Sequence, residues 1–148
     1  MDRSVLDKLL VEVRHFSNRD FLKAAMAVCA LVAAADDEVT PSEHRRIEQA
    51  LKTDPALQVL ETEKAIETLY DYIYALRSGQ PSAAEILSNK VSRMAGNRKR
   101  ARTLMRVAYL VMIADGIIRD KERAEFRRLC YLLDLDPQPV WRDLVARD

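Results

Sequence analysis

A short acidic phrase occurs twice in the chain, and its spacing constrains the fold more than any other feature. The first copy places Asp36 seven residues before Glu43, and the second places Asp115 seven residues before Glu122. The second copy follows the first by 79 residues, and a repeat of this kind predicts two equivalent structural units. Apolar residues before each phrase match at the same offset: Met26 with Met105, Val28 with Val107, Leu31 with Leu110, Val32 with Val111 and Ala35 with Ala114.

Helical periodicity and a shortage of turn residues predict an all-α protein. The chain has 148 residues, which suffices for one domain with its own core, and only 3 of them are glycine. No alternating strand pattern occurs in it. We therefore expect a single domain over residues 1–148, a compact bundle of seven to eight helices. Two repeated helix–loop–helix units, at about 18–52 and 97–133, form its centre.

Apolar spacing and capping residues set the expected helix bounds. The expected helices cover about 4–16, 19–36, 41–52 after the cap Thr40, 62–76, 81–96, 98–115, 120–133 and a last segment that begins at Pro137 after the cap Asp136. The second of these helices is apolar nearly all round from residue 24 to residue 35, which predicts a central, buried position. Gly116 suits a left-handed conformation just past the end of the helix over 98–115.

The repeated acids occupy positions that helix electrostatics treats differently. The two aspartates fall in the last turn of their expected helices, where the helix dipole disfavours a negative charge by roughly 0.3–1 kcal/mol. A local rule broken twice at equivalent positions favours a functional explanation. Glu43 can form a capping box with Thr40, whereas Glu122 has Arg119 at the equivalent position and is explained less well by capping.

Four carboxylates could converge if the two units pack face to face. Oxygen ligands of this kind suit Ca²⁺, Mg²⁺ or Mn²⁺, although the seven-residue spacing is not that of an EF-hand. The predicted ligands of such a divalent cation are Asp36, Glu43, Asp115, Glu122 and Asp37, with Glu38 and Asp120 as further donors nearby. The alternative is that each aspartate orders its loop by accepting hydrogen bonds from backbone N–H groups.

A basic cluster precedes and enters the helix over 98–115. Its members are Lys90, Arg93, Arg98, Lys99, Arg100, Arg102 and Arg106. Arg98, Arg102 and Arg106 share one helix face, and we predict that this face binds a partner; the alternative is an ordinary solvated face. The chain has 24 basic and 23 acidic residues, so its overall charge does not point to nucleic acid. No aromatic residues interleave with the cluster, and we expect no nucleic-acid partner.

The sequence carries no catalytic signature. His15 and His44 lack spaced His or Cys partners, and we interpret both as surface or loop-packing residues. Phosphate loops, nucleophile elbows and zinc-protease motifs are absent, so we expect no enzyme. Cys29 and Cys130 lie in apolar helical runs and are predicted to be buried free thiols. The chain shows no signal peptide and no transmembrane segment, which favours the cytoplasm with peripheral membrane association left open.

The run from Asn18-Arg19-Asp20-Phe21 through Met26-Ala27-Val28-Cys29-Ala30, together with the two acidic phrases, resembles the TerB (tellurite resistance) family. The similarity covers roughly residues 15–140. It implies an all-helical, cytoplasmic, non-enzymatic domain with an internal repeat. The acidic positions for which the family has been proposed to bind divalent metal carry over to Asp36, Glu43, Asp115 and Glu122.

The resemblance also implies a role in resistance to tellurite and other stresses. Family members are thought to work with protein partners at the inner membrane face, among them the integral membrane protein TerC. A related domain occurs in membrane-anchored J-domain co-chaperones, so a metal-independent interaction scaffold or a co-chaperone-like adaptor is the alternative function. Family members commonly have Asp-Gly in the first unit, where this chain has Asp37 at the position that corresponds to Gly116.

Overall fold

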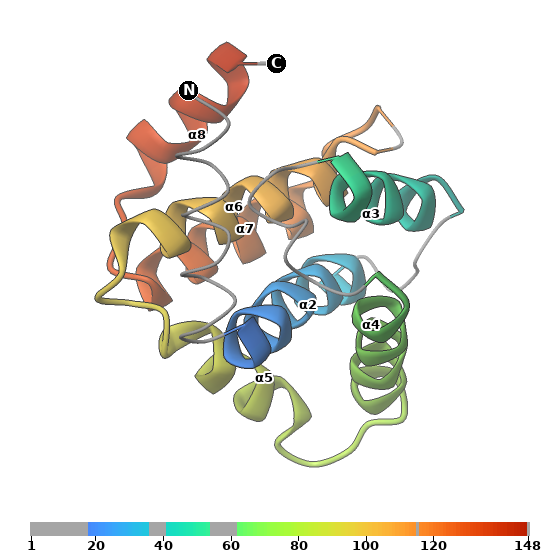
Figure 1. The fold of residues 1–148 in the computed structure, drawn as a ribbon. Helices are drawn as coiled ribbons and strands as arrows, with labels where there is room; N and C mark the ends of the chain where they lie inside the picture. The colour runs from blue at the N-terminus through green and yellow to red at the C-terminus, as the bar shows by residue number, and fades with distance from the viewer. Residues whose placement is uncertain (1–17, 36–40, 54–61, 115, 148) are drawn as a thin grey trace.

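The computed structural model describes residues 18–35, 41–53, 62–114 and 116–147. Within those ranges every regular element is a helix, which confirms the predicted all-α fold (Figure 1). The helices are α2 (Asn18–Ala35), α3 (Pro41–Thr53), α4 (Thr62–Arg77), α5 (Ala83–Ser92), α6 (Arg98–Met112), α7 (Asp120–Leu132) and α8 (Pro137–Arg147). The helix expected over residues 4–16 lies outside the described residues, as do Thr40 and His15.

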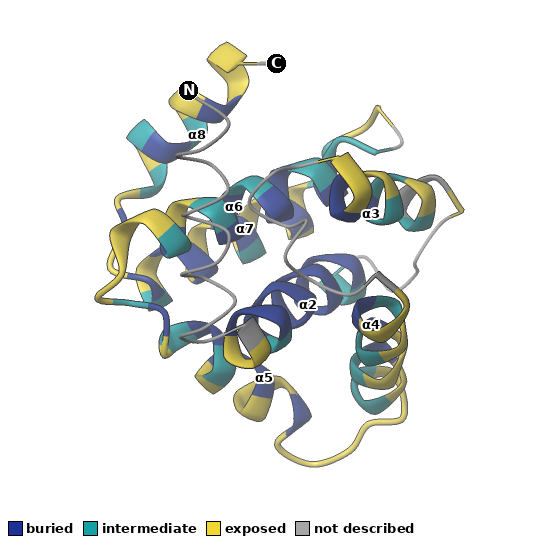
Figure 2. Cartoon of the chain, in the orientation of Figure 1, coloured by how far each residue is buried: buried dark blue, intermediate teal, exposed yellow. Residues whose placement is uncertain are grey.

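Helix α2 forms the centre of the bundle, as its sequence predicts. Every residue from 24 to 33 is buried, and Figure 2 shows α2 as the most continuously buried helix of the molecule. Helices α4, α5, α6 and α7 all pack against it. The small side chains of this segment, mostly alanine and valine, let four neighbouring helices approach the α2 backbone on different sides.

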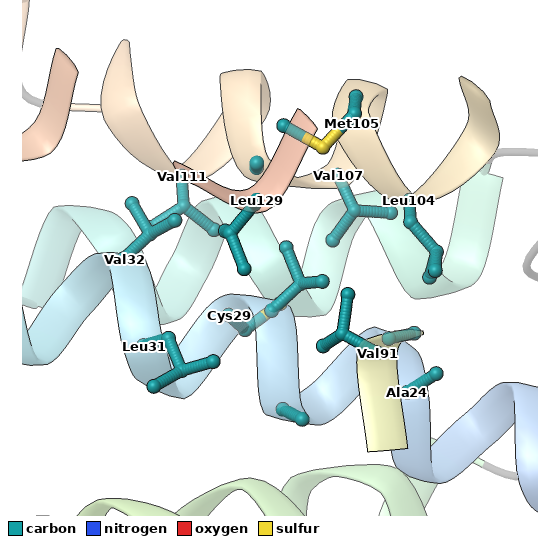
Figure 3. Packing of buried hydrophobic residues seen from close by; sticks show 14 of the residues in the cluster. Ala24, Cys29, Leu31, Val32, Val91, Leu104, Met105, Val107, Val111 and Leu129 are labelled. Atoms are coloured by element: carbon teal, nitrogen blue, oxygen red, sulfur yellow. The ribbon is translucent and has the colours of Figure 1, made fainter. Parts of the chain in front are cut away.

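The core lies mainly between α2 and α6, with contributions from α5 and α7. Figure 3 shows Val32 of α2 beside Val111 of α6, with Leu129 of α7 next to them. Further buried apolar side chains come from α4 and α5, among them Leu69 and Val91. Each fully buried side chain of this size contributes about 1.5–3 kcal/mol relative to exposure, so this layer is the main source of stability.

The helices that flank the α2–α3 connection pack on the helices that flank the α6–α7 connection. Helix α2 packs on α7, while α3 packs on α6. Helices α2 and α6 also contact each other, and they run in the same direction (Figure 1). Their C-terminal ends and the starts of α3 and α7 therefore lie toward one end of the molecule, which we call the loop end. The starts of α2 and α6 lie toward the opposite end.

The predicted bounds of two helices are wrong. The fifth helix was expected to begin at Pro81, but α5 begins at Ala83 because Ser82 adopts a left-handed conformation (φ 66°) that a continuing helix excludes. Helix α5 also ends at Ser92, and the chain then turns through Gly96 (φ 69°) before α6. The turn thus occupies the last residues of the segment that periodicity alone assigns to a helix.

The other incorrect bound is the end of α6. The helix was expected to reach Asp115, but it ends at Met112, with Ile113 as its C-cap residue. Gly116 has the expected positive φ (80°), yet it lies four residues beyond the helix rather than directly after it. Its N–H donates to the carbonyl of Ile113 at 3.0 Å, so a turn replaces the predicted last helical residues.

The last helix docks through aromatic contacts. Asp136 caps α8 as predicted, because its Oδ1 accepts a hydrogen bond from the N–H of Gln138 at 3.2 Å. Trp141 of α8 meets Tyr109 of α6 and Phe126 of α7 in edge-to-face contacts, at centroid distances of 5.4 and 5.1 Å. Such pairs add to the energy of area burial and hold α8 against α6 and α7.

Candidate metal centre and basic face

Glu122 is the only charged side chain that is buried among the residues that the structure describes, with 2% of it exposed. It lies in the first turn of α7, where the helix dipole stabilises a negative charge. Its Oε1 accepts a hydrogen bond from the backbone N–H of Arg119 at 3.2 Å, and the Nη1 atom of Arg119 lies 3.8 Å from the same oxygen. The carboxylate is therefore compensated by a backbone donor and a guanidinium.

The capping role of Glu122 is stronger than the sequence suggested. A non-capping side chain at position 119 argues against a capping role in the sequence, but the donor to Glu122 is the backbone N–H of Arg119, which any residue except proline provides. Helix α6 ends at Met112, three residues before Asp115, so the expectation that Asp115 belongs to the last turn of this helix is wrong.

The other predicted metal ligands cannot be placed beside Glu122. Asp36, Asp37, Glu38 and Asp115 lie outside the described residues, and so does the side chain of Glu43, whose backbone belongs to α3. Asp120 is exposed at the first position of α7. In the described ranges no group of three or more His, Cys, Asp or Glu side chains could hold a metal ion. The convergence of four carboxylates therefore stays a prediction.

His44 is a packing residue in the described structure. Its ring stacks on Tyr70 of α4 at a centroid distance of 5.5 Å, and the Tyr70 hydroxyl and Nδ1 share a short hydrogen bond. Its Nε2 lies 3.6 Å from a carboxylate oxygen of Glu48, one helical turn further along α3. These contacts join α3 to α4, which agrees with the interpretation of His44 as a packing residue.

Both cysteines are free and fully buried, as predicted. Burial raises the pKa of the Cys29 thiol from 9.0 to about 12. Burial, with a smaller effect from the negative charge of Asp136, raises the pKa of Cys130 to about 12 as well. A thiol needs ionisation to act as a nucleophile or a metal ligand, so neither cysteine is suited to that chemistry at neutral pH.

The three arginines predicted to form a partner-binding face differ in their surroundings. Arg98 is exposed at the start of α6, whereas Arg106 is half-buried. Arg102 is exposed and lies 3.9 Å from a carboxylate oxygen of Asp143, so part of its charge is directed toward α8. Of the three, Arg98 is therefore the most available to a partner.

The structure adds a residue to the basic cluster that the sequence did not place there. Lys23 of α2 lies beside Lys90 of α5 and Arg93, the residue that follows α5, and the three bases line a depression of about 40 Å³ together with Asp20. Lys23 is 67 residues before Lys90 in the chain, and only the packing of α2 against α5 brings them together. No local sequence signal reports such a contact.

Comparisons with known proteins identify the family. The family model described as "Tellurite resistance protein TerB" matches residues 22–142. A protein from Alcaligenes sp named "Tellurium resistance protein TerB" is 30% identical over 98 residues, which cover 54% of this chain and 80% of that protein. No solved structure gives a significant match. In the described part of the chain, no helix has the length and apolar character to cross a membrane. The chain belongs to the TerB family.

Proposed function

We propose that this chain is a TerB-like tellurite- and stress-resistance protein that binds a divalent metal ion without catalysing a reaction. In this proposal it acts through protein partners at the inner face of the membrane. Membership of the TerB family supports the resistance role, and this family is generally not enzymatic. The single observation that carries the metal part is the buried carboxylate of Glu122 at the loop end of the bundle.

The chemistry of the acids favours a hard divalent cation. A carboxylate with 2% exposure needs compensating charge or hydrogen bonds, and the proposed neighbours, Asp36, Asp37, Glu43 and Asp115, would add further negative charge. Oxygen donors of this kind match Ca²⁺, Mg²⁺ or Mn²⁺. Further support comes from the parallel course of α2 and α6, because both helices end toward the loop end and each precedes an acidic segment in the sequence.

We also propose that the two acidic segments belong to an internal repeat. Helices α3 and α7 each have 13 residues, and their bounds differ by 79, the offset of the acidic phrases. The packing of α2 on α7 and of α3 on α6 is the reciprocal pattern that a two-fold relation between the units requires. A bound ion would then link one loop from each unit.

Arg119 competes with a metal for Glu122. Its guanidinium lies 3.8 Å from the carboxylate, so a divalent ion bound by Glu122 would have to move or repel it. The substitution Arg119→Gln should therefore increase metal affinity, while the backbone N–H donor to Glu122 stays in place. Isothermal titration with Mn²⁺ measures this change, and an unaltered or weaker affinity would contradict the assignment of Glu122 as a ligand.

Thermal melting with and without Ca²⁺, Mg²⁺ or Mn²⁺ tests the metal site. An ion at about 100 times its dissociation constant stabilises the folded state by about 2.7 kcal/mol, which raises Tm by roughly 5–10 °C for a chain of this size. We expect this rise in the natural protein and a much smaller one in Glu122→Gln. The control is Glu85→Gln, which removes the same charge from an exposed position of α5 and should melt like the natural protein.

The outcomes of this melting experiment are distinct. If no divalent ion raises the Tm of the natural protein, the metal proposal fails. If the ion raises the Tm of Glu122→Gln as much as that of the natural protein, the ion binds elsewhere. A membrane-protein partner that is retained equally in chelator and in metal would favour the metal-independent scaffold. If a TerC-like protein co-purifies with the natural protein but not with the Arg98→Glu variant, this would support the prediction that the face containing Arg98 binds a partner.

A further inference from the structure

The positive charge of the chain is concentrated in one segment. Residues 86–114 contain seven lysines and arginines and not one aspartate or glutamate. The rest of the chain then holds 17 basic and 23 acidic residues, a net charge of −6, although the whole chain has a formal charge of +1. Net neutrality therefore conceals a strongly asymmetric molecule.

The fold gathers most of these bases at the end of the bundle opposite the loop end. Helices α2 and α6 begin there, and a turn of five residues joins the end of α5 to the start of α6 (Figure 1). The depression lined by Lys23, Lys90 and Arg93 shows that charges from α2 and α5 share one surface. We call the following set the basic end face: Arg19, Lys23, Lys90, Arg93, Arg98, Lys99 and Arg100, all of them exposed or half-buried.

The bases of this face form no ion pairs within the described part of the chain, although Asp20 lines the same depression as Lys23, Lys90 and Arg93. No ion pair joins any of the seven to an acid in residues 18–35, 41–53, 62–114 or 116–147. Other surface bases do pair, as Lys52 does with Glu48 and Arg128 with Glu125. The contrast indicates a surface that keeps its charge available rather than one tied up in local ion pairs.

The first turn of α6 makes the charge of this face unfavourable for the free protein. Arg98, Lys99 and Arg100 occupy that turn and no acid accompanies them, so three cations lie at the positive end of the helix dipole. The side chain of Asn97 accepts a hydrogen bond from the N–H of Arg100, which satisfies one backbone donor but leaves the charges uncompensated. An external anion at this end would relieve the repulsion.

We propose that the basic end face docks on the surface of an anionic lipid bilayer, where its lysines and arginines contact lipid phosphate groups. The inference deepens the proposed action at the membrane face and rests on that part of it. It does not depend on metal binding, because Glu122 of the proposed metal site lies in the first turn of α7, toward the loop end and away from the basic end face. Basic segments near a membrane surface are drawn to anionic leaflets in this manner.

The length of the bundle is compatible with a planar anionic partner. Helix α2 has 18 residues and is therefore about 27 Å long, roughly three times the screening length of about 8 Å at physiological ionic strength. A negatively charged plane that touches the basic end face therefore attracts it, while charges at the loop end lie beyond the screening length. The face contains no aromatic residue, so it lacks the stacking surface on which single-stranded nucleic acid binds.

Co-sedimentation with lipid vesicles in the presence of a chelator tests the proposal. We expect the natural protein to bind vesicles that mix phosphatidylglycerol with phosphatidylcholine, and not vesicles of phosphatidylcholine alone. Each base at the surface is worth about a fivefold change in partitioning, so the variant with Lys90→Gln, Arg93→Gln and Lys99→Gln should bind roughly 100-fold more weakly. Raising the salt to about 1 M shortens the screening length to about 3 Å and should release the protein.

A matched control removes the same three charges elsewhere. The variant with Lys64→Gln, Arg77→Gln and Lys121→Gln changes exposed bases of α4 and α7, and its binding should stay within about twofold of the natural protein. Circular dichroism must show that both variants fold. If the control loses as much affinity as the test variant, binding follows net charge alone and the face is not a docking site.

Three further results would overturn the proposal. They are absence of binding to phosphatidylglycerol vesicles, complete competition by inorganic phosphate at the same phosphate concentration, and stronger binding to duplex DNA than to vesicles at equal phosphate. The second result would assign the face to a free oxyanion and the third to nucleic acid. Because this assay contains chelator and the melting assay contains no lipid, failure of one leaves the other intact.

Discussion

In the proposed repeat, α2 and α6 are counterparts at an offset of 79 residues. Helix α2 is enclosed by other helices, whereas α6 has one side in the core and the other at the surface. Four helices cover α2, and its residues 24–33 are all buried. Helix α6 contacts α2, α3, α7 and α8, but it exposes Arg98 and Arg102. The position of Ala27, which is fully buried, is occupied in α6 by the half-buried Arg106. The shared apolar pattern therefore fixes which side of each helix faces the core, while the remaining positions differ with their surroundings.

The α2–α3 and α6–α7 connections also differ, in this case in length. Five residues separate α2 from α3, and seven separate α6 from α7, because α6 ends early at Met112. The following helices correspond without any shift, since Pro41–Thr53 and Asp120–Leu132 differ by 79 at both ends. The starts of α3 and α7 are thus better matched than the ends of α2 and α6. A site built on both loops would depend on the glutamates for its symmetry more than on the aspartates.

The largest effect should come from exchanging residues between α2 and α6. Ala27→Arg places a guanidinium at a position with no exposed surface, which should cost more than about 5 kcal/mol and prevent folding. Arg106→Ala, the reverse exchange, should cost only about 1 kcal/mol, because its side chain is half-buried. Urea unfolding measures both changes. Similar costs for the two exchanges would show that the helices have equivalent surroundings.

Removing a matched pair of core side chains should have the next largest effect. Met26 and Met105 are paired by the 79-residue offset of the proposed repeat and are 1% and 0% exposed. Met26→Ala and Met105→Ala should each destabilise the fold by about 2–5 kcal/mol, because each leaves a cavity in a close-packed layer. The free energies of unfolding in urea give the comparison. A negligible cost for either variant would place that side chain outside the core.

Cys29 of α2 has Ala108 as its counterpart on α6. Only the α2 position therefore carries a thiol whose ionisation makes the stability of the fold depend on alkaline pH. The pKa of Cys29 is about 12 in the folded protein, above the ordinary 9.0. The stability that this thiol contributes is complete below about pH 9 and is lost as the pH rises toward 12, by about 1.4 kcal/mol per pH unit. Cys130 acts in the same direction. Between pH 8 and pH 10, the free energy of unfolding in urea should therefore fall less for Cys29→Ala than for the natural protein. An equal fall in both would contradict this assignment.

The smallest effect should come from the cap of α6. Asn97 accepts a hydrogen bond from the N–H of Arg100 at 3.1 Å, so Asn97→Ala should cost about 1 kcal/mol. Asn18 is the equivalent residue of α2, and a similar cost for Asn18→Ala would extend the correspondence to the helix starts. Thermal melting at neutral pH is sensitive enough for both variants. Stability equal to that of the natural protein in Asn97→Ala would remove the cap from the account.

The sequence predicted helices well where a capping residue or a periodic apolar face marked them. The start of α7 at Asp120, the cap Asp136 and the buried run of α2 were all found in this manner. The end of α6 was misjudged because the run from Val111 to Ala114 is apolar throughout, and hydrophobicity gives no stop signal there. The start of α5 was misjudged because Pro81 suits a first helical turn, while the left-handed Ser82 is not predictable from composition.

The candidate site was harder to predict than the fold. Glu122 was singled out from the repeat, but its burial and its bond to the backbone of Arg119 depend on how α7 packs against α2 and α6. The presence of Lys23 beside Lys90 likewise depends on contacts between segments distant in the chain. Periodicity and motif spacing describe one segment at a time, and neither reports which segments meet.

Paramagnetic broadening of amide signals by Mn²⁺ tests most directly whether a divalent ion binds at the loop end. The account predicts that a small amount of Mn²⁺ broadens the signals of Gly116, Ile117 and Glu122 and those at the start of α3. The signals of Asn97 to Ala101, at the opposite end of α6, should stay sharp, and Glu122→Gln should suppress the broadening. Uniform broadening, broadening centred on another part of the bundle, or no broadening at all would contradict the proposed metal centre.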